Sequence, residues 1–191
     1  MSAIHEKIIT EIFGLYMMYG HADYIGEPLS QIEHMSQAAT LAIREGHSDE
    51  VVLAAFFHDI GHICEMSADA RSMGGYGVKR HEQIGADFLR SRGFPEIIPQ
   101  LVENHVQAKR YLTFTYPAYY NELSEASRKT LDFQGGIMNE REAIGFENHP
   151  FFELSIKMRR WDDLAKETNI PLINTEILKE KARKVLRPSR R

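Results

Sequence analysis

The sequence predicts an all-α protein, folded as a helical bundle around one hydrophobic core. Apolar residues recur at helical spacing along nearly the whole chain, and no segment shows the alternation of apolar and polar residues expected of a strand. Glycines and capping residues divide these stretches into helices, without repeats, low-complexity tracts or linkers between them. The chain has 191 residues, 43% of them hydrophobic, so we expect one domain over residues 1–191.

The first two helices are predicted from their apolar faces and boundaries. Apolar residues at helical spacing predict a helix at residues 3–19, which the following glycine ends. A loop is expected at residues 21–29. Ser30 and Glu33 then have the spacing of a capping box and open a second helix, which ends at Gly46.

The middle of the chain contains a third helix, a loop and a fourth helix. The third begins at Ser48 or Asp49 and is expected to continue through His62. Residues 66–79 are rich in glycine and predict a flexible loop that could cover a site as a lid. His81 opens the fourth helix, which ends near Gly93.

Four further helices are predicted at residues 95–110, 124–134, 151–166 and 174–186. Pro99 lies early in the first of them and is expected to kink it. The aromatic segment at residues 116–120 is predicted to be a loop. The last helix is amphipathic, and the Lys- and Arg-rich stretch at residues 179–191 is expected to be its solvated end.

Composition argues against several classes of protein. The formal net charge of −4 gives no reason to expect nucleic acid as a partner. The single cysteine, Cys64, cannot form an internal disulfide. The first residues lack the apolar segment of a signal peptide, and no apolar run approaches the roughly 18 residues of a membrane helix. We therefore expect a cytoplasmic protein that does not bind a membrane, and no sequence feature assigns its oligomeric state.

The strongest functional signal is an ordered set of possible metal ligands. The chain has nine histidines, and histidine is the commonest metal ligand among side chains. Side chains on separate helices of a bundle can converge on one interior point. Imidazoles with carboxylates, and without thiolates, suit iron, manganese or zinc. The candidate ligands are His34, His58, Asp59, His81, His105 and Asp162.

The adjacent pair His58-Asp59 predicts a site for two metals. Neighbouring residues project about 100° apart on a helix, so both reach the site only if the metals lie against that helix. A carboxylate can bridge two cations and an imidazole cannot, which assigns the bridge to Asp59. The first metal would then take His34, His58 and Asp162, and the second His81 and His105. Each metal keeps positions for exogenous ligands, as in a catalytic site.

Asp163 is the alternative to Asp162 as the last ligand. Asp162 shares a largely apolar, inward stripe with Leu154 and Met158. Asp163 shares a narrower stripe with Arg159. We therefore prefer Asp162.

Two cations are predicted beside the metals. Lys109 lies one turn beyond His105, and Arg159 lies three residues before Asp162, so each shares a helix face with a ligand. Converging cations predict an anionic substrate such as a phosphate or phosphonate, although ion pairs with nearby acids would also explain them. His62 is expected to face the same pocket, where it would hydrogen-bond the substrate, act as an acid or base, or support a ligand.

Tyr24 and Glu27 precede the helix that carries His34. A phenolate is a good ligand for ferric iron, and a carboxylate beside it could bind an ammonium group. Spacing alone favours an exposed loop tyrosine and glutamate.

The ordered ligands, with the segment His58-Asp59-Ile60-Gly61-His62, resemble the HD-domain superfamily over roughly residues 30–165. The resemblance implies a single HD domain with N- and C-terminal helical extensions. HD proteins are mostly metal-dependent phosphohydrolases, and a smaller branch consists of mixed-valent di-iron oxygenases. Some of the hydrolases also have all six ligands, so the ligand set does not choose between the branches.

Further motifs are similar to one small branch, the HD oxygenases that act on 2-amino-1-hydroxyethylphosphonate. These motifs are Tyr24-Ile25-Gly26-Glu27, Ser127-x-x-Thr130, Gln134-Gly135-Gly136 and Met158-Arg159-Arg160-Trp161-Asp162. The resemblance covers nearly the whole chain. It implies two iron ions, Fe(II) and Fe(III), and O2 as co-substrate, in a reaction that cleaves the carbon–phosphorus bond and yields glycine and phosphate.

The same resemblance implies a role for each matching residue. The iron ligated by Asp162 would chelate the substrate hydroxyl and a phosphonate oxygen. Tyr24 would occupy an iron position until the substrate arrives, and Glu27 would take the substrate ammonium. The residues expected around the phosphonate are His62, Lys109, Ser127, Thr130, Gln134 and Arg159.

Alternative functions follow from the same residues. An HD phosphohydrolase acting on a nucleotide or phosphomonoester would use the metals, Lys109 and Arg159 equally well, but it gives Tyr24 and Glu27 no role. A catalytically inactive HD module is expected to lack ligands, and all six are present. A related oxygenase for an N-methylated analogue or a polyol also fits, because one glutamate does not set the methylation state of an amine.

Overall fold

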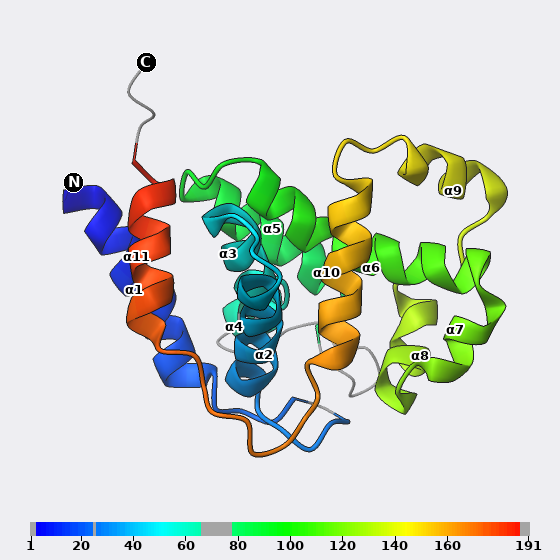
Figure 1. The fold of residues 1–191 in the computed structure, drawn as a ribbon, viewed down its shortest axis with the longest axis horizontal. Coiled ribbons are helices and arrows are strands. Elements are labelled where there is room, and N and C mark those ends of the chain that lie inside the picture. The colour runs from blue at the N-terminus through cyan, green and yellow to red at the C-terminus, as the bar shows by residue number, and fades with distance from the viewer. Residues whose placement is uncertain (1–2, 25, 66–77, 188–191) are drawn as a thin grey trace.

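The computed structural model describes residues 3–24, 26–65 and 78–187. Its helices are α1 (Ala3–Tyr19), α2 (Gln31–Arg44), α3 (Asp49–Phe57), α4 (Ile60–Cys64), α5 (His81–Ser91), α6 (Ile97–Thr115), α7 (Pro117–Glu122), α8 (Glu125–Phe133), α9 (Glu140–Glu147), α10 (Phe152–Leu164) and α11 (Thr175–Val185), as Figure 1 shows. Asp23 and Ser30 form an isolated antiparallel bridge, and none of the named elements in the described ranges is a strand. The prediction of an all-α fold is confirmed.

The core is built around α3, whose sequence is almost entirely apolar. Residues 51–57 are all buried, and α3 packs against α2, α6 and α11. Burial of each large apolar side chain contributes about 1.5–3 kcal/mol to the stability of the fold, so α3 is strongly held against the helices around it. The rings of Phe56 and Phe57 pack against those of Phe13 and Tyr16 of α1, which brings the N-terminal helix onto the core.

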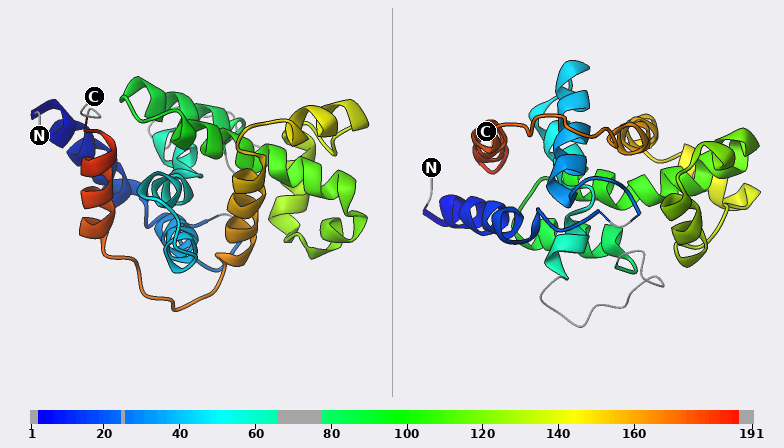
Figure 2. Two further views of the ribbon diagram at one scale, coloured as in Figure 1. Left: turned by 45° about the horizontal axis from the view of Figure 1, so that its top comes forward. Right: turned by 90° about the horizontal axis from the view of Figure 1, so that it is seen from below.

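Two groups of helices lie at opposite ends of this core. Figures 1 and 2 show α1 and α11 side by side at one end, and α7, α8 and α9 together at the other end of α6. A smaller apolar cluster joins α9 to α6 through Phe146, Tyr111 and Leu112. No helix in the described ranges is both long and apolar enough to cross a membrane.

The third helix is shorter than predicted, because it breaks at the His58-Asp59 pair. Helix α3 ends at Phe57 and α4 begins at Ile60. His58 keeps a helical backbone, whereas Asp59 has φ −105° and ψ 13° and caps α4. The chain changes direction here, so the two side chains are not held at the fixed angle that one continuous helix would impose.

Other boundaries also differ from the predictions. The aromatic segment expected to be a loop is largely helical, because Pro117 occupies the first turn of α7, where its missing N–H removes no helical hydrogen bond. Helix α9 was not predicted, although Asn139 and Glu142 form a capping box at its start. Pro99 lies in the first turn of α6, where again no helical donor is lost. Most of the loop predicted at residues 66–79 lies outside the described residues.

Candidate metal centre

Six predicted ligands converge in the interior from five parts of the fold. His34 comes from α2, His58 and Asp59 from the junction of α3 and α4, His81 from the start of α5, His105 from α6 and Asp162 from α10. All six are at most 4% exposed. Ionisable groups are buried together in this way only where they are paired or coordinate a cation.

The four histidines form two pairs through their Nε2 atoms. The Nε2 atoms of His34 and His58 are 3.0 Å apart, and those of His81 and His105 are 3.1 Å apart. Asp59 lies between the pairs. Its Oδ2 atom is 3.6 Å from His34 Nε2 and 3.5 Å from His58 Nε2. Its Oδ1 atom is 3.2 Å from His81 Nε2 and 3.5 Å from His105 Nε2. One carboxylate oxygen therefore faces each pair.

Backbone carbonyls orient all four imidazoles. The Nδ1 atom of His34 donates to Ala165 O at 2.9 Å, and that of His58 donates to Ala55 O at 2.9 Å. The Nδ1 atoms of His81 and His105 contact Val78 O at 3.3 Å and Val102 O at 2.6 Å. A carbonyl only accepts, so the proton of each neutral ring stays on Nδ1 and the Nε2 lone pairs point at one another.

This donor set fits metal ions. Two donor atoms about 2.1 Å from one cation, at a right or tetrahedral angle, lie roughly 3.0–3.4 Å apart. The Nε2–Nε2 separations of 3.0 and 3.1 Å and the 3.3 Å between His34 Nε2 and Asp162 Oδ1 lie in that range. Converging lone pairs and carboxylates repel one another unless protons or cations lie between them, which is the physical reason for a metal centre here.

The two histidines of each pair differ in the direction of their pKa shift. Burial lowers the pKa of His34, but the hydrogen bond and charge of Asp162 outweigh it and the pKa is raised. Burial lowers the pKa of His58. Asp59 raises the pKa of His81 against the effect of burial, whereas burial lowers that of His105. One imidazole in each pair therefore holds a proton more tightly than its partner, and a metal must displace that proton.

Asp162, and not Asp163, faces the histidines. Asp162 Oδ1 is 3.3 Å from His34 Nε2. Asp163 instead pairs with the Arg159 guanidinium and accepts a hydrogen bond from the Tyr119 hydroxyl. The same guanidinium donates to Asp162 Oδ2 at 2.6 Å, so Arg159 is fixed between the two carboxylates.

Gly61 allows α4 and α5 to approach closely enough to join the two halves of the site. A Cβ atom at this position would lie 1.9 Å from the backbone oxygen of His81. Any side chain here would separate the two helices and move His81 away from Asp59.

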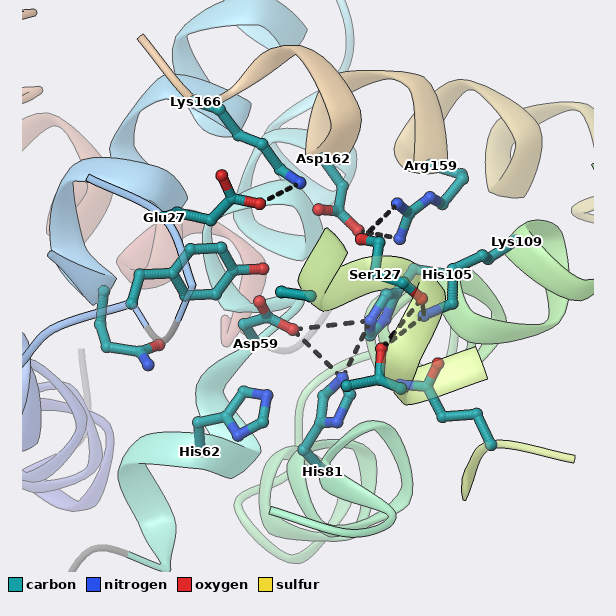
Figure 3. Close-up of a pocket in the computed structure, with 15 residues that line it drawn as sticks. Glu27, Asp59, His62, His81, His105, Lys109, Ser127, Arg159, Asp162 and Lys166 are labelled. Atoms are coloured by element: carbon teal, nitrogen blue, oxygen red, sulfur yellow. Dashed lines mark hydrogen bonds and ion pairs between the residues drawn. The ribbon is translucent and has the colours of Figure 1, made fainter. Parts of the chain in front are cut away.

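A pocket opens directly beside the centre. Figure 3 shows Glu27, Lys166, Arg159 and Lys109 around it, together with four of the candidate ligands, Asp59, His81, His105 and Asp162. Its lining includes every non-ligand residue that the sequence predicted for the site: Tyr24, Glu27, His62, Lys109, Ser127, Thr130, Gln134 and Arg159.

One side of the pocket carries the two predicted cations. Lys109 and Arg159 are 2% and 3% exposed. The Lys109 ammonium donates to Thr130 Oγ1 at 3.1 Å, and Arg159 reaches Ser127 Oγ at 3.4 Å. Burial, and next the charge of Arg159, lower the pKa of Lys109 to about 7. Two cations held this close repel each other, so an anion between them would be bound favourably.

The opposite side carries Tyr24 and Glu27. The Tyr24 ring stacks on the His34 imidazole with centroids 4.1 Å apart. Burial, followed by the charges of Asp59 and Asp162, raises the pKa of Tyr24, so its hydroxyl keeps its proton unless a cation lies beside it. Glu27 pairs with Lys166 at 2.8 Å.

Two polar lining residues were not predicted from the sequence. Lys166 lies four residues after Asp162 within the helix predicted at residues 151–166, and that predicted helix phase could have suggested it, although α10 ends at Leu164 and Lys166 lies beyond it. Gln31 opens α2 and is 4% exposed, and its Oε1 atom has no hydrogen-bond partner among the described residues. No sequence signal distinguishes it from any other helix-opening polar residue.

His62 is oriented by the backbone of Val78, whose N–H donates to His62 Nδ1 at 3.1 Å. The proton of the neutral ring is therefore on Nε2. The ring stacks on His81 with centroids 4.1 Å apart, and burial, then the neighbouring His81, lower the pKa of His62 to about 3. His62 is thus a neutral hydrogen-bond donor rather than a cation at neutral pH.

Comparison with known proteins agrees with this geometry. Residues 31–132 match the model of the HD domain family. The chain is 46% identical over 166 residues to an uncharacterized protein of Acanthamoeba polyphaga mimivirus, covering 87% of this chain and 75% of that protein. It is 39% identical over 164 residues to the [1-hydroxy-2-(trimethylamino)ethyl]phosphonate dioxygenase (glycine-betaine-forming) of Leisingera caerulea, covering 86% and 83%.

A third relative, the hydroxymethylphosphonate dioxygenase of Gimesia maris, is 37% identical over 158 residues, covering 83% of this chain and 78% of that protein. Two of these three relatives are thus named for oxygenation of a phosphonate. The chain belongs to the HD-domain family, as a relative of phosphonate dioxygenases within it.

Proposed function

We propose that this protein is a di-iron oxygenase that cleaves the carbon–phosphorus bond of 2-amino-1-hydroxyethylphosphonate. The reaction with one O2 yields glycine and phosphate, and it balances without any other reactant. The observation that carries the proposal is the pocket itself. It has buried cations on one side, a carboxylate on the other, and a cluster of imidazoles and carboxylates at its base.

The ligands divide naturally between two ions. His34, His58 and Asp162 would hold one, His81 and His105 the other, and Asp59 would bridge them, since each of its oxygens faces one histidine pair. When bound, an Fe(II)/Fe(III) pair supplies the redox chemistry and the open position that a reaction with O2 needs.

The side chains of the pocket position the substrate. Lys109 and Arg159 bind the phosphonate with the hydroxyls of Ser127 and Thr130, and Gln134 lines the same pocket. The neutral His62 donates a hydrogen bond from Nε2. Glu27 takes the substrate ammonium at the far side of the pocket. Binding the phosphonate and the ammonium at opposite sides fixes the carbon chain between them, above the metal centre.

Oxygen dependence tests the proposal. Iron-loaded protein should release phosphate from 2-amino-1-hydroxyethylphosphonate in air, with one glycine formed per phosphate and one O2 consumed. Under strict anaerobiosis the release should stop. Equal release without O2, or release from a nucleotide or phosphomonoester instead, would assign the site to a phosphohydrolase.

A further inference from the structure

The carboxylate proposed to bind the substrate ammonium already has an ammonium beside it. Lys166 Nζ lies 2.8 Å from Glu27 Oε1, and the two side chains are 16% and 10% exposed. Figure 3 shows the pair at the edge of the pocket, with both side chains turned toward it. A charge pair this sheltered from water is held more strongly than a surface pair.

The backbone that carries Lys166 is fixed on both sides. The carbonyl of Ala165 accepts from His34 Nδ1 at 2.9 Å. The backbone of Glu167 exchanges two hydrogen bonds with the Gln37 side chain, at 2.8 and 3.1 Å. The ammonium of Lys166 can therefore move only as far as its own flexible side chain allows.

Other partners are in place for both the lysine and an incoming amine. Lys166 Nζ also donates to Ser124 Oγ at 3.2 Å, so it keeps one acceptor if it leaves Glu27. Gln31, whose Oε1 atom has no partner among the described residues, lines the same pocket and is a further acceptor for a substrate ammonium.

We propose that Lys166 sets the substrate range by acting as an internal substitute for the substrate ammonium. This inference rests on the proposed function. Lys166 neutralises Glu27 when the bound phosphonate has no amine, and an aminated substrate has to displace it. The wild-type protein therefore discriminates less against hydroxyphosphonates without an amine than Glu27 alone would.

The direction of the effect follows from charge balance. Without Lys166, Glu27 is an uncompensated, sheltered carboxylate in a pocket that must also take a phosphonate dianion. A substrate ammonium would restore the balance, whereas a substrate without an amine would leave the carboxylate bare. Removing Lys166 should therefore increase the preference for the aminated substrate over the hydroxyphosphonate without an amine.

The test compares two substrates that differ only in the amine, 2-amino-1-hydroxyethylphosphonate and 1-hydroxyethylphosphonate. In iron-loaded Lys166→Met, the ratio of their kcat/KM values should rise about tenfold or more, the worth of one charge-assisted contact. Lys166→Arg should keep the wild-type ratio. Lys157→Met is the matched control, because Lys157 lies on the outer face of α10 and pairs with Glu45 outside the pocket.

A double variant separates a direct role from a merely structural one. Lys166 acts through Glu27, so Lys166→Met should leave the ratio unchanged when Glu27 is already Gln. Calorimetry under anaerobic conditions gives a readout without turnover. Iron-loaded Lys166→Met should bind 2-aminoethylphosphonate more tightly relative to ethylphosphonate than wild type does. Lys166→Gln takes the place of the methionine variant if that variant does not fold.

The outcomes are distinct. An active Lys166→Met protein with the wild-type ratio in both assays would overturn the inference and leave the proposed function standing. So would a shift of equal size in the Glu27→Gln background. A wild-type protein that releases phosphate from neither hydroxyphosphonate would overturn the proposed function and the inference with it.

Discussion

Replacing Asp59 is the most direct test of a shared metal ligand. Its two oxygens face different histidine pairs, at 3.5–3.6 Å on one side and 3.2–3.5 Å on the other. Asp59→Ala removes one ligand from each proposed ion at once. The first ion keeps His34, His58 and Asp162, while the second keeps only two imidazoles.

The magnitude follows from the number of ligands. Structural zinc binds through four ligands with roughly 10–16 kcal/mol, so one ligand is worth roughly 2.5–4 kcal/mol, or about 10²–10³-fold in affinity. Asp59→Ala should lose the two-imidazole ion entirely and weaken the other by that factor. Asp59→Asn keeps one oxygen and should retain at most one ion.

Metal analysis of protein purified with iron and passed through a desalting column measures this directly. Wild type should hold two irons per chain, and Asp59→Ala less than one. Asp49→Ala is the control, because that carboxylate pairs with Lys181 at the start of α3, away from the site. Two irons retained in Asp59→Ala would refute the bridging assignment.

Three further predictions follow from the same structure. Lys109→Ala should lower kcat/KM by roughly tenfold or more with iron content unchanged, because it removes a charge-assisted contact to the anion. Arg159→Ala should in addition reduce iron affinity by about 10–100-fold, because Arg159 holds Asp162. Equal iron retention in the two variants would contradict this difference. Gly61→Ala should lower the free energy of unfolding by about 3 kcal/mol or more, measured by chemical unfolding, because the new Cβ would clash with the backbone oxygen of His81. Gly14→Ala is the control: a Cβ there meets nothing within 4 Å in α1, so this variant should raise the free energy of unfolding by about 0.5–1 kcal/mol. Iron loading below pH 6.5 should release about two protons per chain, one from each histidine pair, and the number released should fall as the pH rises through the raised pKa values of His34 and His81. Calorimetry in buffers of different ionisation enthalpy counts the released protons. A count near zero at every pH would contradict the presence of one protonated histidine in each pair.

The fold class could be read from the sequence because helical periodicity is a local property. The apolar face of α1 and the capping box at Ser30 are determined by residues within one or two turns, and the structure reproduces both. Helix α9 was missed although it has a local capping box at Asn139, because its apolar face is short. Its eight residues bury only Ala143 and Phe146, and what holds it is the apolar contact with α6, far away in the sequence.

The candidate ligands were predicted from their residue types and their order along the chain. Histidines and carboxylates spaced along successive helices of a bundle have few explanations other than a shared interior site. The choice of Asp162 over Asp163 followed from helical phase, and in the structure Asp162 is the one that faces His34.

Sequence alone therefore determined the helical class, the ligand types and the cations beside them, because each depends on residue chemistry and short-range spacing. The sequence also placed Asp59 between the two histidine pairs, but only the tertiary structure shows what holds it there, namely the break between α3 and α4 and the close approach at Gly61. The tertiary structure also decided that Glu27 is already paired, because Lys166 meets it across 139 residues of chain. Such contacts arise from packing between helices, and no local pattern encodes them.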